Sequence, residues 1–133
     1  MTRALLATLV ALLSIPAFAD TDWASIGGEE TVDVITTDED GETRETVIWV
    51  LALDGVGYIR TGSGTRWGDD VERDPQIALR VGEIDHPVRA EFVEDDADRE
   101  RITAGFREKY GWSDAMISWM RGSRPRIMRL HDR

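Results

Sequence analysis

The sequence predicts a mainly β fold of the α+β type, in which six antiparallel strands close into a partly open barrel with two or three short helices. Short segments with alternating apolar residues, tight turns between them and few segments of helical spacing predict this fold. We expect one domain at residues 31–133, preceded by a connector at 20–30. Its expected strands are 31–37, 46–53, 56–61, 76–82, 88–93 and 126–131.

The first three strands rest on the clearest signals. In the first, Val32 and Val34 share one side of the pleat. The second, 46–53, is almost wholly apolar, so we expect it to be buried on both faces at the centre of the sheet. Asp54-Gly55 then predicts a tight hairpin into the third, because both positions adopt positive φ at low cost. The connector has room for one helical turn around Trp23.

Two helices are expected between or after the later strands. A short one over 67–73 is ended by Asp74-Pro75, and a longer one over 95–110 has Ile102, Phe106 and Tyr110 on one face. Aspartates lie at the start of the longer helix and Gly111 ends it, as the helix dipole and C-cap rules require. Ile84–Pro87 is expected to form the turn between the fourth and fifth strands.

A further short helix is expected to begin at Ser113 and end at Gly122. Its Met116, Trp119 and Met120 form an apolar patch. Methionine and tryptophan are enriched in interface cores, so this patch either faces a partner or covers one mouth of the barrel. The sequence leaves both alternatives open.

The first 19 residues, Met1–Ala19, have the pattern of a secretory signal peptide. A basic Arg3 precedes an apolar run that is too short to span a bilayer, and Ala17-Phe18-Ala19 is a small-x-small cleavage site. We therefore expect cleavage after Ala19 and a periplasmic or secreted protein with no membrane segment after cleavage.

The charge and the lack of cysteine exclude several functions. The chain of 133 residues has 26 acidic residues against 16 lysines and arginines, a formal charge of −10. Such a charge repels a polyphosphate backbone, so we expect no nucleic-acid partner. With no cysteine, the chain has no disulfides, thiolate metal sites or thiol nucleophiles.

The segment most suggestive of chemistry is the loop that follows the third strand, residues 60–66. It combines two arginines, three hydroxyls and two glycines where a strand ends and a helix starts. Glycines let backbone amides converge, arginine grips phosphate oxygens, and a helix start adds partial positive charge, so the loop is typical of an anion site. An ordinary polar loop with two surface arginines is the alternative, because so short a motif also occurs without function.

A family resemblance extends this interpretation. Residues Glu42–Leu79 resemble the FMN-binding split β-barrel superfamily of the pyridoxamine 5′-phosphate oxidase type, which includes deazaflavin-dependent reductases. Residues Glu94–Leu130 further resemble a short bacterial family of unknown function within it. The matching positions are Arg44, Thr46–Val50, Asp54-Gly55, Tyr58, Thr61, Thr65-Arg66, Asp74-Pro75, Ile77–Leu79, Phe106–Gly111 and Ile127–Leu130.

The resemblance implies a phosphate-tailed flavin, FMN or a deazaflavin, bound at the interface of a homodimer. Where the superfamily often has a lysine, this chain has Trp67, which either stacks on the isoalloxazine ring or packs against the barrel. Packing is favoured, because buried aromatic residues mostly belong to the core. The candidate cofactor-binding residues are Arg44, Arg60, Thr61, Ser63, Thr65, Arg66 and Trp67. Catalytic residues are not assigned, since a bound flavin would itself carry the redox chemistry.

Acidic and histidine residues suggest no metal site. Gly41 as the sixth position of a calcium loop would place Val47 at the twelfth, where a glutamate is required, so the acids are turn and helix-start residues. His86 and His131 lie on different expected strands without further ligands nearby. Because some split barrels bind haem through a histidine, haem remains a minor alternative.

Two functions are therefore expected to compete. The first is a flavin- or deazaflavin-dependent oxidoreductase on a small molecule. The second is a non-catalytic binding module that kept the barrel and lost the cofactor, or binds haem. The glycine, hydroxyl and arginine loop favours the first, whereas the missing lysine and the expected export favour the second.

Overall fold

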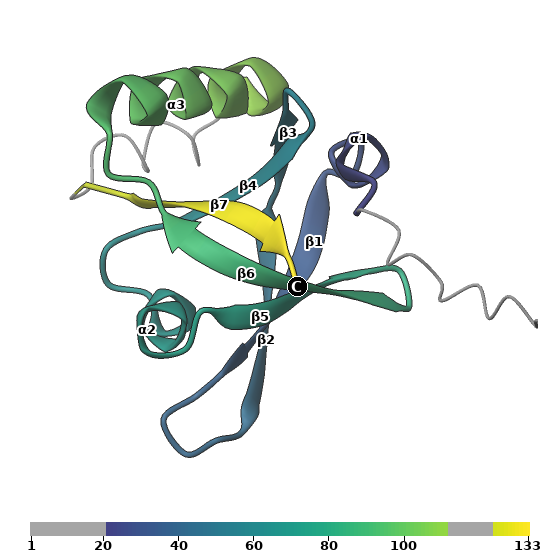
Figure 1. Cartoon of the computed structure of the whole chain (residues 1–133), viewed down its shortest axis with the longest axis vertical. Coiled ribbons are helices and arrows are strands. Elements are labelled where there is room, and N and C mark those ends of the chain that lie inside the picture. The colour runs from purple at the N-terminus through teal and green to yellow at the C-terminus, as the bar shows by residue number, and fades with distance from the viewer. Residues whose placement is uncertain (1–20, 112–123) are drawn as a thin grey trace, which may run out of the picture.

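The computed structural model describes residues 21–111 and 124–133 (Figure 1). Within them, seven strands form one antiparallel sheet in the order β2-β1-β5-β6-β7-β4-β3. The strands are β1 (Thr31–Thr37), β2 (Thr43–Trp49), β3 (Leu51–Leu53), β4 (Val56–Thr61), β5 (Gln76–Val81), β6 (Ile84–Phe92) and β7 (Arg126–Asp132). The helices are α1 (Trp23–Ile26), α2 (Arg66–Arg73) and α3 (Asp96–Tyr110).

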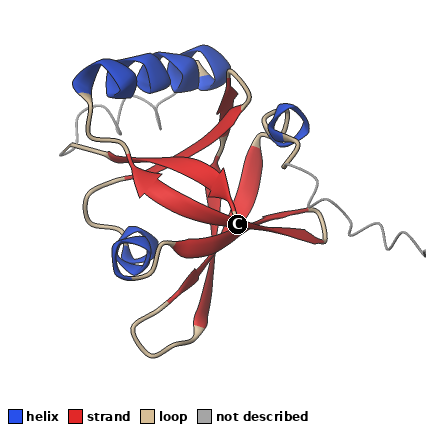
Figure 2. Cartoon of the chain, viewed as in Figure 1, coloured by secondary structure: helices blue, strands red, loops and turns tan. Residues whose placement is uncertain are grey.

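The sheet curls into a half-open barrel with its helices on the outside (Figure 2). In Figure 1, α3 lies across the end formed by β3 and β4, and α2 lies at another side, beside β5. Contacts join α3 to β3, α2 to β1 and α1 to β3. The expected mainly β split-barrel class is thus confirmed, with seven strands instead of six.

The additional strand comes from the apolar segment 46–53, which was expected to be one central strand. The chain instead breaks at Val50: β2 pairs with β1, and β3 pairs with β4. These two strands lie at opposite ends of the strand order, and Val47 is 67% exposed, so burial on both faces was wrong. The segment 46–53 is apolar because its bend supplies side chains to both hydrophobic clusters, Val50 to one and Leu51 to the other.

The expected turn at Ile84–Pro87 is also wrong. The chain reverses at Gly82-Glu83, with Gly82 at a φ of +62°, and β6 begins at Ile84. Pairing of β6 with β7 starts only at Val88, so the stretch before it has a neighbour on one side. Proline is tolerated in such an edge stretch, which is why Pro87 does not end the strand.

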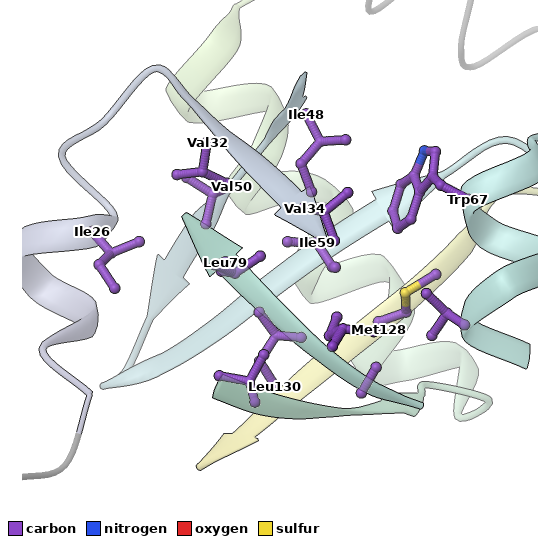
Figure 3. Close-up of a cluster of buried hydrophobic side chains, with 14 of the residues drawn as sticks. Ile26, Val32, Val34, Ile48, Val50, Ile59, Trp67, Leu79, Met128 and Leu130 are labelled. Carbon is purple, nitrogen blue, oxygen red and sulfur yellow. The ribbon is translucent and has the colours of Figure 1, made fainter. Parts of the chain in front are cut away.

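The core consists of two hydrophobic clusters. The barrel interior is the larger, and Figure 3 shows its side chains converging from α1, α2 and several strands. The smaller one lies beneath α3, where Ile102 and Phe106 are fully buried as their helical spacing predicts. Trp23 and Ile26 of α1 belong to the barrel interior, and a Cβ at Gly57 would overlap the indole of Trp23.

The remaining element boundaries agree closely with the expected ones. Strands β1 and β4 have the expected bounds, and the helices and the other strands differ by a few residues at most. The expected helix at 113–122 and the expected signal at 1–19 lie outside the described residues. Of the helices that the structure describes, none is long and apolar enough to cross a membrane.

Candidate functional site

The loop 62–65 joins β4 to α2, so the expected strand-to-helix junction is present. Thr65 is the N-cap of α2, and its hydroxyl accepts a hydrogen bond from the backbone N–H of Gly68 at 3.3 Å. The hydroxyls of Thr61 and Thr65 are hydrogen-bonded to each other. These contacts satisfy one orphan donor at the helix start and hold the loop against the end of β4.

Arg126 on β7 holds the same loop, and sequence reasoning missed it. Its guanidinium donates to the carbonyl of Gly62 at 3.1 Å and to that of Thr65 at 3.2 Å. It also pairs with Asp69 at 2.9 Å and Glu72 at 3.3 Å. A Cβ at Gly68 would overlap this guanidinium and the methyl group of Thr61, so a larger residue there would displace Arg126 from the loop. In the sequence, the small residue Gly68 in the first turn of α2 was the one sign that another side chain approaches closely there.

A polar hollow of about 290 Å³ lies beside α2 and the hairpin of β1 and β2. It contains two of the expected cofactor-binding residues, Arg44 from β2 and Arg66 from α2. Arg66 is exposed and has no ion pair with any residue that the structure describes. The lining residues are Glu39, Arg44, Arg66, Asp69, Asp70 and Arg73.

Asp70 organises the polar hollow from within the fold. It is only 1% exposed, and its Oδ2 accepts hydrogen bonds from Thr36 Oγ1 and from Arg44 Nε, both at 2.8 Å. Arg73 lies 3.5 Å from Oδ1. The hydrogen bond to Asp70 raises the pKa of Arg44 above its ordinary value. A buried carboxylate must be paired, so the charge of Arg44 is engaged by the fold.

A second, apolar hollow of about 250 Å³ opens between β2, β4 and the start of α2. Aromatic and aliphatic side chains form most of its wall, and one guanidinium lies among them. We call these two depressions the polar hollow and the apolar hollow. The apolar hollow is lined by Val47, Ile48, Trp49, Arg60, Thr61, Gly62 and Trp67.

Arg60 supplies the guanidinium of the apolar hollow and is only 7% exposed. Its guanidinium carbon lies 4.7 Å from the ring centre of Phe106 and 5.9 Å from that of Trp49. Burial lowers the pKa of Arg60 below its ordinary value, and the electrostatic effect of Tyr110 opposes this in part. Cation–π contacts strengthen when water is excluded, so the aromatic rings hold this cation in place.

Trp67 packs into the barrel interior and is 6% exposed (Figure 3). Part of its surface still lines the apolar hollow. This placement agrees with packing as its main role and leaves a face of the ring at the hollow. Ser63, at the tip of the loop, is exposed and lines neither hollow.

Six of the seven candidate residues therefore form two neighbouring groups, and Ser63 lies outside both. The arginines of the polar hollow form one, and Arg60, Thr61 and Trp67 form the other, with Thr65 bonded to Thr61. Consecutive residues Arg66 and Trp67 line one hollow each, so the two hollows adjoin at the start of α2. Planar apolar surface beside clustered guanidiniums fits the ring and the phosphate of a flavin.

Histidines and acidic turns lie apart from this arrangement. His86 is on β6 and His131 on β7, and neither lines a hollow; His131 Nε2 lies 3.6 Å from Glu91 Oε2. Asp38 accepts from two backbone amides in its turn, as expected for a hairpin. No group of three or more histidine or acidic residues in 21–111 and 124–133 is arranged to hold a metal ion.

The curled antiparallel sheet has the split β-barrel fold that is also seen in a putative pyridoxamine 5′-phosphate oxidase, as the resemblance predicted. The chain belongs to the DUF2255 family, described as an uncharacterized protein conserved in bacteria, whose model matches residues 22–130. No curated protein matches the chain by sequence.

Solved structures show the same fold at low sequence identity. A conserved hypothetical protein, Rv2991 from Mycobacterium tuberculosis, is 20% identical with a TM-score of 0.65, covering 84% of this chain and 78% of its own. The haem storage protein HutZ from Vibrio cholerae is 14% identical with a TM-score of 0.66, covering 80% and 83%. A putative pyridoxamine 5′-phosphate oxidase from Listeria innocua is 14% identical with a TM-score of 0.60, covering 81% and 87%.

Proposed function

We propose that this chain binds a flavin or deazaflavin and acts as an oxidoreductase on a small molecule. The observation that carries the proposal is the apolar hollow, which Trp49, Arg60 and Trp67 line together and which adjoins the polar hollow. Apolar walls with a few placed polar groups are typical of cofactor sites. The similarity to a putative pyridoxamine 5′-phosphate oxidase supports the choice of cofactor.

The chain's own residues would bind and orient the cofactor. The apolar hollow receives the planar ring, and Arg66 at the polar hollow faces the phosphate. Arg44 contributes less to the phosphate, because it already pairs with Asp70 at 2.8 Å. The bound flavin supplies hydride transfer, and the surrounding rings exclude water from one side of it.

A homodimer is part of the proposal. Cofactor pockets usually measure about 300–1,000 Å³ and bury most of their ligand, whereas the hollows measure about 290 and 250 Å³ and are open. Edge strand β2 presents Val47, 67% exposed, at the rim of the apolar hollow. A second copy seated there supplies the missing wall. Sedimentation equilibrium should give twice the chain mass, and a monomer at micromolar concentration would contradict the dimer.

Export completes the proposal. The pattern of Met1–Ala19 supports cleavage after Ala19 and a periplasmic or secreted location. Intact-mass measurement on protein expressed with the full sequence should give a chain that begins at Asp20 in the extracytoplasmic fraction. An uncleaved chain in the cytoplasm would contradict it.

A non-catalytic binding module is the second candidate, and the ion pair of Arg44 favours it. Arg44, one of the candidate cofactor-binding residues, already pairs with Asp70, so the candidate residues offer a phosphate fewer cations than the sequence suggests. The fold similarity to a haem storage protein makes haem one ligand to test for this module.

Titration of the full-length protein with FMN, riboflavin, a deazaflavin and haemin separates these candidates. The proposal predicts saturable binding of FMN with a shifted visible spectrum, and weaker binding of riboflavin, which lacks the phosphate. Reduction of the bound flavin by NADPH or NADH, followed by reoxidation, would indicate an oxidoreductase. Binding of haemin alone would support the binding module, and binding of none of the four would overturn cofactor binding.

Arg66 provides the matched variant. Arg66→Ala should weaken FMN binding by about 1.5–3 kcal/mol, the range for a charged hydrogen bond, and leave riboflavin binding unchanged. Arg89→Ala is the control, because Arg89 is an exposed arginine on β6 that lines neither hollow. Equal FMN affinities for the two variants would show that the phosphate lies elsewhere.

A further inference from the structure

The C-terminal end of α3 contacts the chain at the break between β2 and β3. Tyr110 is the last residue of α3, and Gly111, with a φ of +69°, ends the helix directly after it. The break itself is Val50, which is fully buried and lies between the two strands. Figure 1 shows α3 lying across this region of the sheet.

The hydroxyl of Tyr110 satisfies the backbone at this break. It accepts from the N–H of Val50 at 3.0 Å, and it lies within donating distance of the carbonyls of Glu30 at 2.7 Å and Val50 at 3.0 Å. Lys109 adds hydrogen bonds from Nζ to the carbonyls of Val50 and Glu29, both at 2.6 Å. A buried backbone group without a partner is costly, so these side chains stabilise the bend.

The ring of Tyr110 contacts the wall of the apolar hollow. It stacks on Trp49 with ring centres 4.1 Å apart and planes 6° apart, and it lies 6.1 Å from Phe106. The guanidinium carbon of Arg60 lies 5.9 Å from the ring centre of Trp49 and 4.7 Å from that of Phe106. One side chain thus fixes the backbone bend through its hydroxyl and the hollow wall through its ring.

We propose that Tyr110 is a positioning residue for the apolar hollow, holding Trp49 and, through it, Arg60 in the geometry that binds a ligand. The role in ligand binding rests on the proposed function, whereas the role in fixing the hollow does not.

The stacked ring and the hydroxyl of Tyr110 can be tested separately, because Tyr110→Phe keeps the ring and removes the hydrogen bonds to Val50 and Glu30.

The experiment compares Tyr110→Phe with Tyr58→Phe. Tyr58 is also buried against α3, but its hydroxyl accepts from Arg101 at 3.3 Å, and it does not line the apolar hollow. Amide exchange at Val50 and the indole resonance of Trp49, identified with Trp49→Phe, report on the hollow by NMR. FMN titration reports on binding.

For Tyr110→Phe we expect amide exchange at Val50 to accelerate and the dissociation constant for FMN to rise, each by about three- to tenfold, the range for one hydrogen bond. The Trp49 indole resonance should shift or broaden. Tyr58→Phe should leave all three as in the wild type. A wild-type Val50 amide and Trp49 resonance in Tyr110→Phe would overturn the proposal.

The two proposals fail in different ways. If the wild type binds no flavin, the proposed function is wrong, and the NMR measurements still decide whether Tyr110 positions the hollow. If the wild type binds FMN and Tyr110→Phe changes the hollow without changing the FMN affinity, the ligand does not use this wall, and the positioning role in binding is overturned.

Discussion

The polar and apolar hollows adjoin, yet they hold their arginines in opposite ways. In the polar hollow, Arg44 hydrogen-bonds to Asp70, a carboxylate that is 1% exposed. In the apolar hollow, Arg60 is surrounded by Phe106 and Trp49, and burial lowers its pKa. A cation paired with a buried carboxylate stabilises the fold, whereas a desolvated cation beside aromatic faces contributes less to stability. The arginines of the two hollows therefore differ in how much they contribute to stability. Under the proposed function, Arg60, which contributes less, is the arginine that contacts the ring of the cofactor.

The largest expected loss of stability comes from the support of the apolar hollow. Phe106 is fully buried under α3, so Phe106→Ala should lower the free energy of unfolding by about 4 kcal/mol, as large-to-small core substitutions do. Urea denaturation followed by circular dichroism measures it. Glu108→Ala, an exposed position on the same helix, should change the value by no more than about 0.5 kcal/mol. Equal effects would show that α3 does not support the hollow.

The next largest effect should come from Asp70 in the polar hollow. Asp70→Ala leaves Arg44 and Thr36 without their buried acceptor and should destabilise the protein by about 3 kcal/mol. The neighbouring Asp69 also pairs with an arginine, Arg126, but it is exposed, so Asp69→Ala should cost less than about 1 kcal/mol. Thermal unfolding of both variants tests this contrast. Equal destabilisation by Asp70→Ala and Asp69→Ala would show that burial of the carboxylate does not determine its contribution to stability.

Much of the fold was predictable, because alternation and turn residues are local signals. Strands β1 and β4 and the helix face of Ile102 and Phe106 follow from them. The break at Val50 was not predictable, since a continuous apolar run does not say that its two halves pair with different strands. The edge position of β2 is likewise a property of the whole sheet.

The candidate site was predicted less completely. The loop at 62–65 and its capping by Thr65 follow from residue types near a helix start. The partners of the arginines that line the two hollows come from distant parts of the chain: Asp70 for Arg44, 26 residues away, and Phe106 for Arg60. Arg126 and Tyr110 enter the site from β7 and α3, and no local pattern marks such long-range contacts.

A pair of arginine variants sharpens the comparison between the hollows. Arg44→Met removes a charged hydrogen bond to Asp70 and should destabilise the protein by about 2 kcal/mol. Arg60→Met replaces a desolvated cation by an apolar chain and should stay within about 1 kcal/mol of the wild type. Differential scanning calorimetry distinguishes them. If Arg60→Met were the more destabilising change, Arg60 would contribute more to stability than Arg44, and the contrast between the two hollows would be wrong.

The smallest expected effect is on stability at low pH, and it arises from Glu91, outside both hollows. The hydrogen bond from Arg129 lowers the pKa of Glu91 below its ordinary value of 4.5. The folded state therefore favours the ionised carboxylate, so this stabilisation is present above pH 4.5 and is lost as the pH falls through the lower folded value. The melting temperature of Glu91→Gln should depend less on pH below 4.5 than that of the wild type. Identical pH profiles would contradict this.

A crystal structure of the protein soaked with FMN tests the central claim most directly. The account predicts density for the isoalloxazine ring against Trp49 and Trp67, with Arg60 donating to it, and density for the phosphate beside Arg66. A flavin bound at another face of the barrel, or no density at a flavin concentration that saturates the protein in solution, would contradict it.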